Sequence, residues 1–166
     1  QPPASRAPSD LLRSPVMTWY YWVMGAKVGL FDADVYGPSL PTMVSPEHRV
    51  LQMDPETKGI TPTEYLGVKL VSFGFTNQGS AIMRGPMVSG LVNQLLTTTD
   101  WGELDYLVMD LPPGTGDIQL TLCQSVPITA AVVVTTPQKL AFIDVAKIRS
   151  PGCVAKKQIW HHQRIE

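Results

Sequence analysis

The chain has 166 residues, of which 44% are hydrophobic, and its 13 Lys and Arg residues against 14 Asp and Glu residues leave a net charge of −1. This length and composition are typical of about one domain with a packed core, and they exclude a chain that is disordered throughout. A near-neutral chain lacks the basic field of a nucleic-acid-binding protein. Its apolar runs are shorter than the ~18 residues of a membrane span. We therefore expect neither a nucleic-acid partner nor a membrane span.

The first half of the chain predicts strands separated by proline-containing loops. Residues 27–31 (KVGLF) form an apolar run that stops at Asp32, as in a buried strand. Residues 32–46 contain three prolines and one glycine and predict a loop. Residues 50–65 alternate weakly around a turn and predict a small hairpin, and residues 68–75 predict another strand.

The second half alternates helical and strand patterns. A helix is predicted to begin at Pro86, because proline is tolerated in the first helical turn and the residues that follow repeat apolar side chains at i, i+4. Two prolines and two glycines in residues 112–116 predict a loop. The remaining predicted elements are strands at residues 105–110 and 128–135 and helices at 117–124 and 139–148. This alternation predicts an α/β fold with three layers, in which crossover helices cover both faces of a parallel sheet.

Two of the predicted strands end in aspartate. Asp32 and Asp34 follow the first strand, and Asp110 ends the strand before the proline-rich loop. Ligands bind beyond the carboxyl ends of strands in parallel α/β sheets, and carboxylates there can hold Mg²⁺ directly or through its waters. An apolar strand followed by Asp is also the Walker B pattern. Many strands end in an Asp that caps the following turn, so capping stays open as an alternative.

Four segments resemble motifs of one family. Residues 110–117 (DLPPGTGD) resemble the Walker B segment, and residues 32–41 (DADVYGPSLP) the switch segment, of the Mrp/ApbC family of P-loop ATPases, which are relatives of MinD and ParA. Residues 82–90 (IMRGPMVSG) and 135–138 (TTPQ) also match in order and spacing. The resemblance covers about residues 24–148 and is greatest to the plant plastid branch. It implies a MinD/ParA-like P-loop NTPase fold.

The resemblance also implies a role for each matching site residue. Asp110 would hold the hydration shell of Mg²⁺, Asp34 would orient or activate the attacking water as the catalytic residue, and Asp32 would support the switch loop. Pro137 and Gln138 would lie near the adenine of ATP. The implied function is ATP-dependent assembly of [4Fe-4S] clusters and their transfer to apoproteins in the chloroplast stroma, by a homodimer or by pairing with a full-length homologue.

The other candidate side chains carry weaker signals. Arg84 lies in the family's RGPM stretch. It has either a role of that stretch or the structural role of an ion pair at the surface or at the start of the helix. Cys123 is expected to be a buried small hydrophobe, and His48 to be solvated. Cys153 and the two histidines that follow it have no usual metal-site spacing. The two cysteines form no CxxC pair, so the sequence identifies no iron–sulfur ligands, and it fits a reducing compartment.

The N-terminal part departs from the family. The family's glycine loop, of the KGGVGKS kind, would fall near residues 5–11, yet no glycine precedes Gly25. That loop supplies the backbone N–H groups and the lysine that bind phosphates. We therefore expect a partial NTPase domain at residues 24–148, between a divergent arm (1–23) and a divergent tail (149–166). This partial domain is expected to bind ATP·Mg²⁺ weakly and to hydrolyse little ATP.

The aromatic segment of that arm replaces a helix of the family. Residues 16–23 (VMTWYYWV) are β-favouring, and we expect a strand or an exposed segment there. Residues 1–15 predict either the end of a transit peptide or a disordered arm. Two other functions stay open: a non-catalytic module that pairs with an intact homologue, and a MinD/ParA-like positioning ATPase. The lack of an amphipathic tail and of a basic patch disfavours the second.

Overall fold

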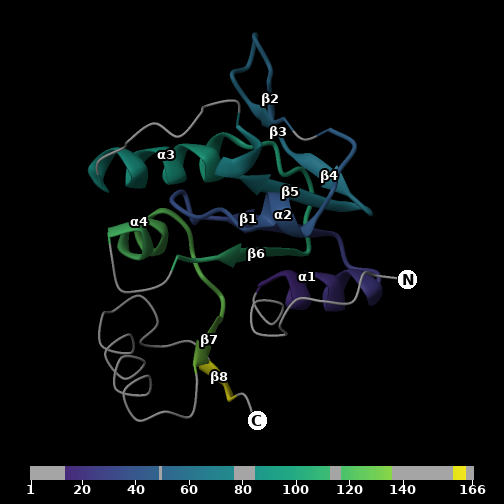
Figure 1. Ribbon diagram of the computed structural model, residues 1–166, viewed down its shortest axis with the longest axis vertical. Coiled ribbons are helices and arrows are strands. Elements are labelled where there is room, and N and C mark those ends of the chain that lie inside the picture. The colour runs from purple at the N-terminus through teal and green to yellow at the C-terminus, as the bar shows by residue number, and fades with distance from the viewer. Residues whose placement is uncertain (1–13, 49, 77–84, 113–116, 136–158, 164–166) are drawn as a thin grey trace. The chain divides into compact units, whose positions relative to one another are not determined.

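The computed structural model describes residues 14–48, 50–76, 85–112, 117–135 and 159–163 (Figure 1). The chain divides into two compact units, residues 1–112 and 113–166. The first unit holds the larger sheet and the predicted aspartates. None of the helices in the described ranges has the length and apolar character that crossing a bilayer requires.

The described part of the first unit contains a four-stranded sheet, a two-stranded sheet and three α-helices. Its elements are α1 (Ser14–Val23), β1 (Val28–Asp32), α2 (Leu40–Met43), β2 (Gln52–Met53), β3 (Ile60–Thr61), β4 (Thr63–Tyr65), β5 (Val68–Ser72), the 3₁₀ turn η1 (Phe73–Phe75), α3 (Gly85–Thr98) and β6 (Tyr106–Asp110). The larger sheet has the order β4-β5-β1-β6. Strands β5, β1 and β6 are parallel, as predicted, whereas β4 is antiparallel to β5. The sheet is therefore mixed, because a hairpin strand adds to one edge.

β1 lies inside the sheet and is buried at every residue. Because side chains alternate along a strand, Leu30 and Asp32 face one side of the sheet and Phe31 faces the other. On the side of Leu30, the core consists of Leu30, Leu40, Val44, Val68, Leu70 and Phe75. On the other side, Phe31 makes an edge-to-face contact with Trp101, with 6.4 Å between ring centroids.

The aromatic segment forms a helix, so the expectation of a strand or an exposed segment there is wrong. Trp19 and Trp22 of α1 pack against the core cluster. Trp19 also makes edge-to-face contacts with Trp22 and Tyr65, at centroid distances of 5.4 and 5.8 Å. The i, i+3 spacing places both indoles on one helix face. Packing these large rings on the core outweighs the β-preference of the segment.

The loops contain more structure than the sequence predicts. The predicted loop at residues 32–46 includes the short helix α2. The predicted hairpin at 50–65 is confirmed by the antiparallel pair β2 and β3, although its end, β4, joins the larger sheet. The strand predicted at 68–75 ends at Ser72 and continues as η1.

The described part of the second unit contains one helix and two parallel strands. These are α4 (Asp117–Ser125), β7 (Ala131–Thr135) and β8 (Ile159–Gln163), with β7 paired to β8. The predictions of a helix at 117–124 and a strand within 128–135 are confirmed. The helix predicted at 139–148 lies outside the described residues.

Candidate functional site

The carboxyl ends of β5, β1 and β6 meet at one edge of the four-stranded sheet. In the parallel register, Asp32 on β1 lies between Ser72 on β5 and Asp110 on β6. Strand alternation puts these three side chains on the same face of the sheet. Three strands that are far apart in the sequence thus bring two carboxylates and a hydroxyl together, at the end of the sheet where ligands bind in parallel α/β folds.

Asp32 is buried, with 3% of its surface exposed, and both of its carboxylate oxygens accept hydrogen bonds. Oδ2 accepts from the Ser72 hydroxyl at 2.9 Å and from Leu40 N at 3.4 Å. Oδ1 accepts from Asp34 N at 3.1 Å. Burial raises the pKa of Asp32 to about 6, although these hydrogen bonds lower it, and the charge of Asp110 adds to the rise. Asp32 therefore caps the loop after β1, and it also borders Asp110.

Asp34 begins the loop after β1 and is half-buried. Its Oδ1 accepts hydrogen bonds from Tyr36 N at 3.2 Å and from Gly37 N at 3.1 Å. These contacts form an Asx turn that fixes the side chain, and Oδ2 accepts no hydrogen bond from the described residues. One carboxylate oxygen is thus held in place, while the other can accept a hydrogen bond or a proton from a water molecule.

Asp110 ends β6 and is half-buried. Its carbonyl oxygen accepts a hydrogen bond from Ala33 N at 2.9 Å. The loop that carries Asp34 is therefore anchored to both neighbouring strands, to β6 through Ala33 and to β5 through the contact between Asp32 and Ser72.

Sequence reasoning missed Ser72, which is fully buried. Its hydroxyl donates to Asp32 and accepts from Gly74 N at 3.2 Å. The turn beyond it packs closely on the loop prolines, since a Cβ atom at Gly74 would lie 2.5 Å from Pro41 Cγ and 3.2 Å from Pro38 Cγ. Glycine is the residue that this approach permits. The available signal for Ser72 was a hydroxyl at the end of an otherwise apolar strand.

Several candidate residues lie outside the described part of the chain, namely Arg84, Pro137, Gln138 and Cys153. Cys123 was expected to be buried and is half-buried on α4, while His48 is exposed, as expected. Within the described ranges, no group of three or more His, Cys, Asp or Glu side chains is placed to hold a metal ion. Direct chelation by three such side chains therefore has no support in this part of the chain.

The chemistry of Asp32 and Asp110 fits a hydrated divalent cation. Carboxylate oxygens are the hard donors that Mg²⁺ prefers, and the ion usually keeps several of its waters. The hydrogen-bond donors to Asp32 are all neutral groups. A cation held beside this buried carboxylate would favour its ionised form.

A family model described as ParA, NUBPL iron-transfer P-loop NTPase, matches residues 16–157. The chain belongs to this family. The match confirms the resemblance to the Mrp/ApbC proteins, and the structure is consistent with part of their α/β fold. The family match begins within α1, so it includes most of the aromatic helix.

The relatives carry names from iron–sulfur cluster metabolism. The chain is 82% identical to the chloroplastic Fe-S cluster assembly factor HCF101 of Arabidopsis thaliana over 124 residues. The matched residues make up 75% of this chain and 23% of that protein. It is 50% identical to the iron-sulfur cluster carrier protein of Escherichia coli K12 over 125 residues, and this match covers 74% of this chain and 34% of the carrier. The chain thus spans about a quarter to a third of the length of these relatives.

A solved structure shows the same architecture. The nucleotide-binding protein of Archaeoglobus fulgidus, in complex with ADP, is 35% identical, and the two structures superpose with a TM-score of 0.69. The likeness covers 88% of this chain and 56% of that protein. The P-loop NTPase fold predicted for this family member is therefore supported by both sequence and structure.

Proposed function

We propose that this chain takes part in the ATP-dependent assembly of [4Fe-4S] clusters and in their transfer to apoproteins in the chloroplast stroma. The observation that carries the proposal is the 82% identity over 124 residues to a chloroplastic Fe-S cluster assembly factor. Bacterial relatives at 50% identity are named iron-sulfur cluster carriers, which supports the same cargo. The cluster is a substrate of the reaction and not a resident cofactor.

In this proposal, the nucleotide binds beyond the ends of β1 and β6. Asp110 would hold Mg²⁺ through its hydration shell, and the ion would neutralise charge on the phosphates. The Oδ2 atom of Asp34 orients the attacking water, and Asp32 keeps the loop of Asp34 in place through its contacts with Ser72 and the main chain. The ADP in the Archaeoglobus fulgidus relative supports nucleotide binding by this fold.

We expect the chain alone to be a poor ATPase. Residues 5–11, where the resemblance would place the phosphate-binding loop, contain neither glycine nor lysine, and such a loop supplies the backbone N–H groups and the lysine that bind phosphates. The chain also has two cysteines, Cys123 and Cys153, whereas a [4Fe-4S] cluster takes four thiolate ligands. We propose that the chain acts in a homodimer or in a pair with a full-length homologue, and in the pair the homologue would supply the phosphate-binding loop.

The same observations favour a second candidate function, a non-catalytic module that modulates an intact homologue. In such a pair the homologue supplies the phosphate-binding loop, and this chain supplies a docking surface. The two candidates differ in whether the chain itself exchanges cluster or nucleotide.

The test compares the chain alone, its Asp34→Asn variant, and the chain mixed with full-length HCF101. Calorimetry with ATP·Mg²⁺ and phosphate release should show weak binding and background turnover for the chain alone, unchanged by Asp34→Asn. Turnover by the chain alone that disappears in Asp34→Asn contradicts the expectation of a poor ATPase.

Cluster transfer from the reconstituted mixture to a [4Fe-4S] apoprotein then tests the carrier proposal. Transfer that increases with the amount of the chain supports it. A stable pair that transfers no more cluster than the homologue alone supports the modulating module.

A further inference from the structure

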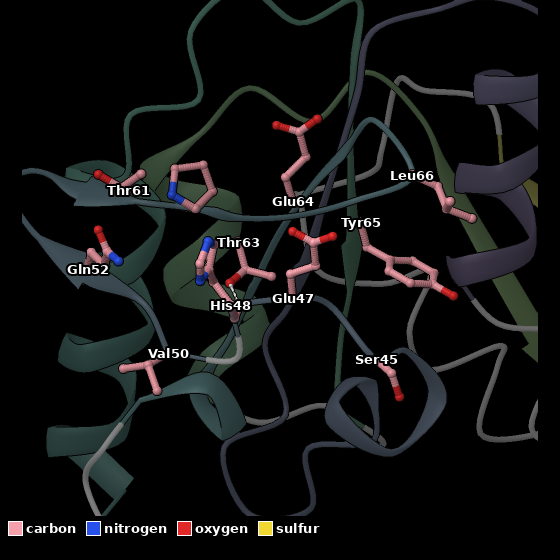
Figure 2. Close-up of a pocket in the computed structure, with 11 residues that line it drawn as sticks. Ser45, Glu47, His48, Val50, Gln52, Thr61, Thr63, Glu64, Tyr65 and Leu66 are labelled. Atoms are coloured by element: carbon pink, nitrogen blue, oxygen red, sulfur yellow. Dashed lines mark hydrogen bonds between the residues drawn. The ribbon is translucent and has the colours of Figure 1, made fainter.

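A hollow of about 570 Å³ lies beside β4, and none of its lining residues belongs to the aspartate site. Its walls come from the loop after α2, from β2 to β4, and from the turn that follows β4 (Figure 2). We propose that this hollow binds an extended segment of another protein that carries lysine or arginine side chains. The proposal goes beyond the proposed function and does not depend on nucleotide binding.

The outer edge of β4 offers main-chain groups for strand pairing. Among the described strands, β4 is the last at its edge of the sheet, and a two-residue turn, residues 66–67, joins it to β5 with φ values of 50° and 79°. These values are typical of a type I′ hairpin. The closing pair of such a hairpin, Tyr65 and Val68, is hydrogen-bonded, so Glu64 and Lys69 form the non-hydrogen-bonded pair. The N–H and C=O of Glu64 therefore point away from β5, where an added strand would lie.

The hollow carries acidic side chains without partners in the described part of the chain. Glu47 and Glu64 line it, both are exposed, and neither makes an ion pair with a described residue. Lys69 faces Glu64 across the hairpin but donates its ammonium to the Trp101 carbonyl at 2.7 Å. Residues 45–66 contain four acidic and two basic residues. A cationic segment is therefore attracted to this surface, and an anionic segment is repelled.

Tyr65 gives the hollow a firm apolar wall. Its ring is held by the edge-to-face contact with Trp19, and Leu66 beside it is 59% exposed. The aliphatic stem of a lysine or arginine packs on such a surface while its charge stays near a carboxylate. The Thr63 hydroxyl donates to the His48 carbonyl at 2.6 Å and ties the loop to β4 (Figure 2). The hollow is thus formed before a ligand arrives.

An NMR titration tests the proposal with a defined probe, a ten-residue peptide that alternates threonine and lysine. We expect the amide signals of Glu64, Tyr65 and Gln52 to move and to saturate. Glu47→Gln and Glu64→Gln should each weaken binding by about two- to fivefold, as for exposed charge pairs. The matched control is Glu103→Gln, which removes the same charge from an exposed side chain that does not line the hollow and should leave the affinity unchanged.

Two further peptides separate strand pairing from charge. The peptide with glutamate in place of lysine should not bind. The lysine peptide with N-methyl groups on alternate residues should bind about threefold more weakly or worse, because it cannot donate hydrogen bonds to β4. The proposal is overturned if Glu103→Gln weakens binding as much as Glu64→Gln does. It is also overturned if the shifts spread over the whole surface, or if the N-methylated peptide binds equally well.

Discussion

β1 and β6 are neighbouring strands of nearly the same kind, yet they differ in burial. Both are rich in apolar residues, and both end in an aspartate, Asp32 and Asp110. The register partners Val28 and Tyr106 show the contrast, with 1% and 47% of their surface exposed. β1 lies between two strands, whereas β6 is the last of the strands that the structure describes in this sheet. Position in the sheet therefore determines a burial that the composition of the strands does not reveal.

The same difference separates the two carboxylates in chemistry. Asp32 is enclosed, its oxygens are occupied by hydrogen bonds, and burial raises its pKa to about 6. Asp110 is half-buried on the more exposed strand. One carboxylate therefore fixes the loop that carries Asp34, and the other is in the better position to meet a ligand.

The largest effect on the free energy of unfolding is expected when a leucine is replaced by alanine, and the size of the loss should differ between β1 and β6. Leu30 is 3% exposed in the core cluster, whereas Leu107 of β6 is half-buried. Leu30→Ala should lower the free energy of unfolding by about 3 to 4 kcal/mol, because it removes buried contacts and leaves a cavity. Leu107→Ala should cost about 1 kcal/mol, because less apolar surface is lost. Urea denaturation with unchanged m-values checks both, and equal losses would contradict the difference in burial between the strands.

Ionisation of Asp32 is expected to lower the free energy of unfolding by up to about 3 kcal/mol as the pH rises. The pKa of Asp32 in the folded state, about 6, lies above its ordinary value of 3.8, so the folded state binds the proton more tightly than the unfolded state. The stabilisation that this proton binding gives the folded state is complete below about pH 4 and is lost as the pH rises through about 6. Asp32→Asn should therefore gain stability relative to the parent chain between pH 4.5 and pH 7.

Urea denaturation at both pH values measures this gain. Asp110→Asn serves as the comparison, because removal of its charge should lower the pKa of Asp32 and move the step to lower pH. A difference between Asp32→Asn and the parent chain that does not change with pH would show that Asp32 is not titrating in this range.

A smaller loss is expected for Ser72→Ala. The variant removes the hydroxyl that donates to Asp32 and accepts from Gly74 N, in a fully buried place. We expect a loss of about 1 to 3 kcal/mol at pH 7. Thr97→Ala is the control, because the Thr97 hydroxyl is exposed and bonds to carbonyls of its own helix, and it should change stability by less than about 0.5 kcal/mol. Losses of the same size in both variants would show that the hydrogen bond from Ser72 to Asp32 adds no specific stability.

The sequence predicts the elements whose signals are local. The apolar runs of β1 and β6 and the i, i+4 rows of α3 are strong patterns, and strand-end logic finds Asp32 and Asp110. It does not find α1, because the packing of Trp19 on Tyr65 and the core is a tertiary contact that local preference cannot show. Nor does it find Ser72, whose importance depends on the register of β5 with β1. The hollow beside β4 likewise depends on how a hairpin folds onto the sheet.

The smallest effect concerns how α1 is attached to β6. Tyr21 stacks on Tyr106, with ring centroids 4.4 Å apart and an interplanar angle of 13°. A double-mutant cycle of Tyr21→Ala and Tyr106→Ala should give a coupling of about 0.5 to 1.5 kcal/mol. The cycle of Tyr20→Ala with Tyr106→Ala should give a smaller coupling, since Tyr20 is 60% exposed and is linked to Tyr106 only indirectly, through its contact with Tyr21. Equal couplings in the two cycles would mean that the exposed end of β6 gains nothing specific from the helix. A coupling confined to the stacked pair would show that a ring of α1 stabilises the exposed end of β6. β1 needs no such contact, because strands lie on both sides of it.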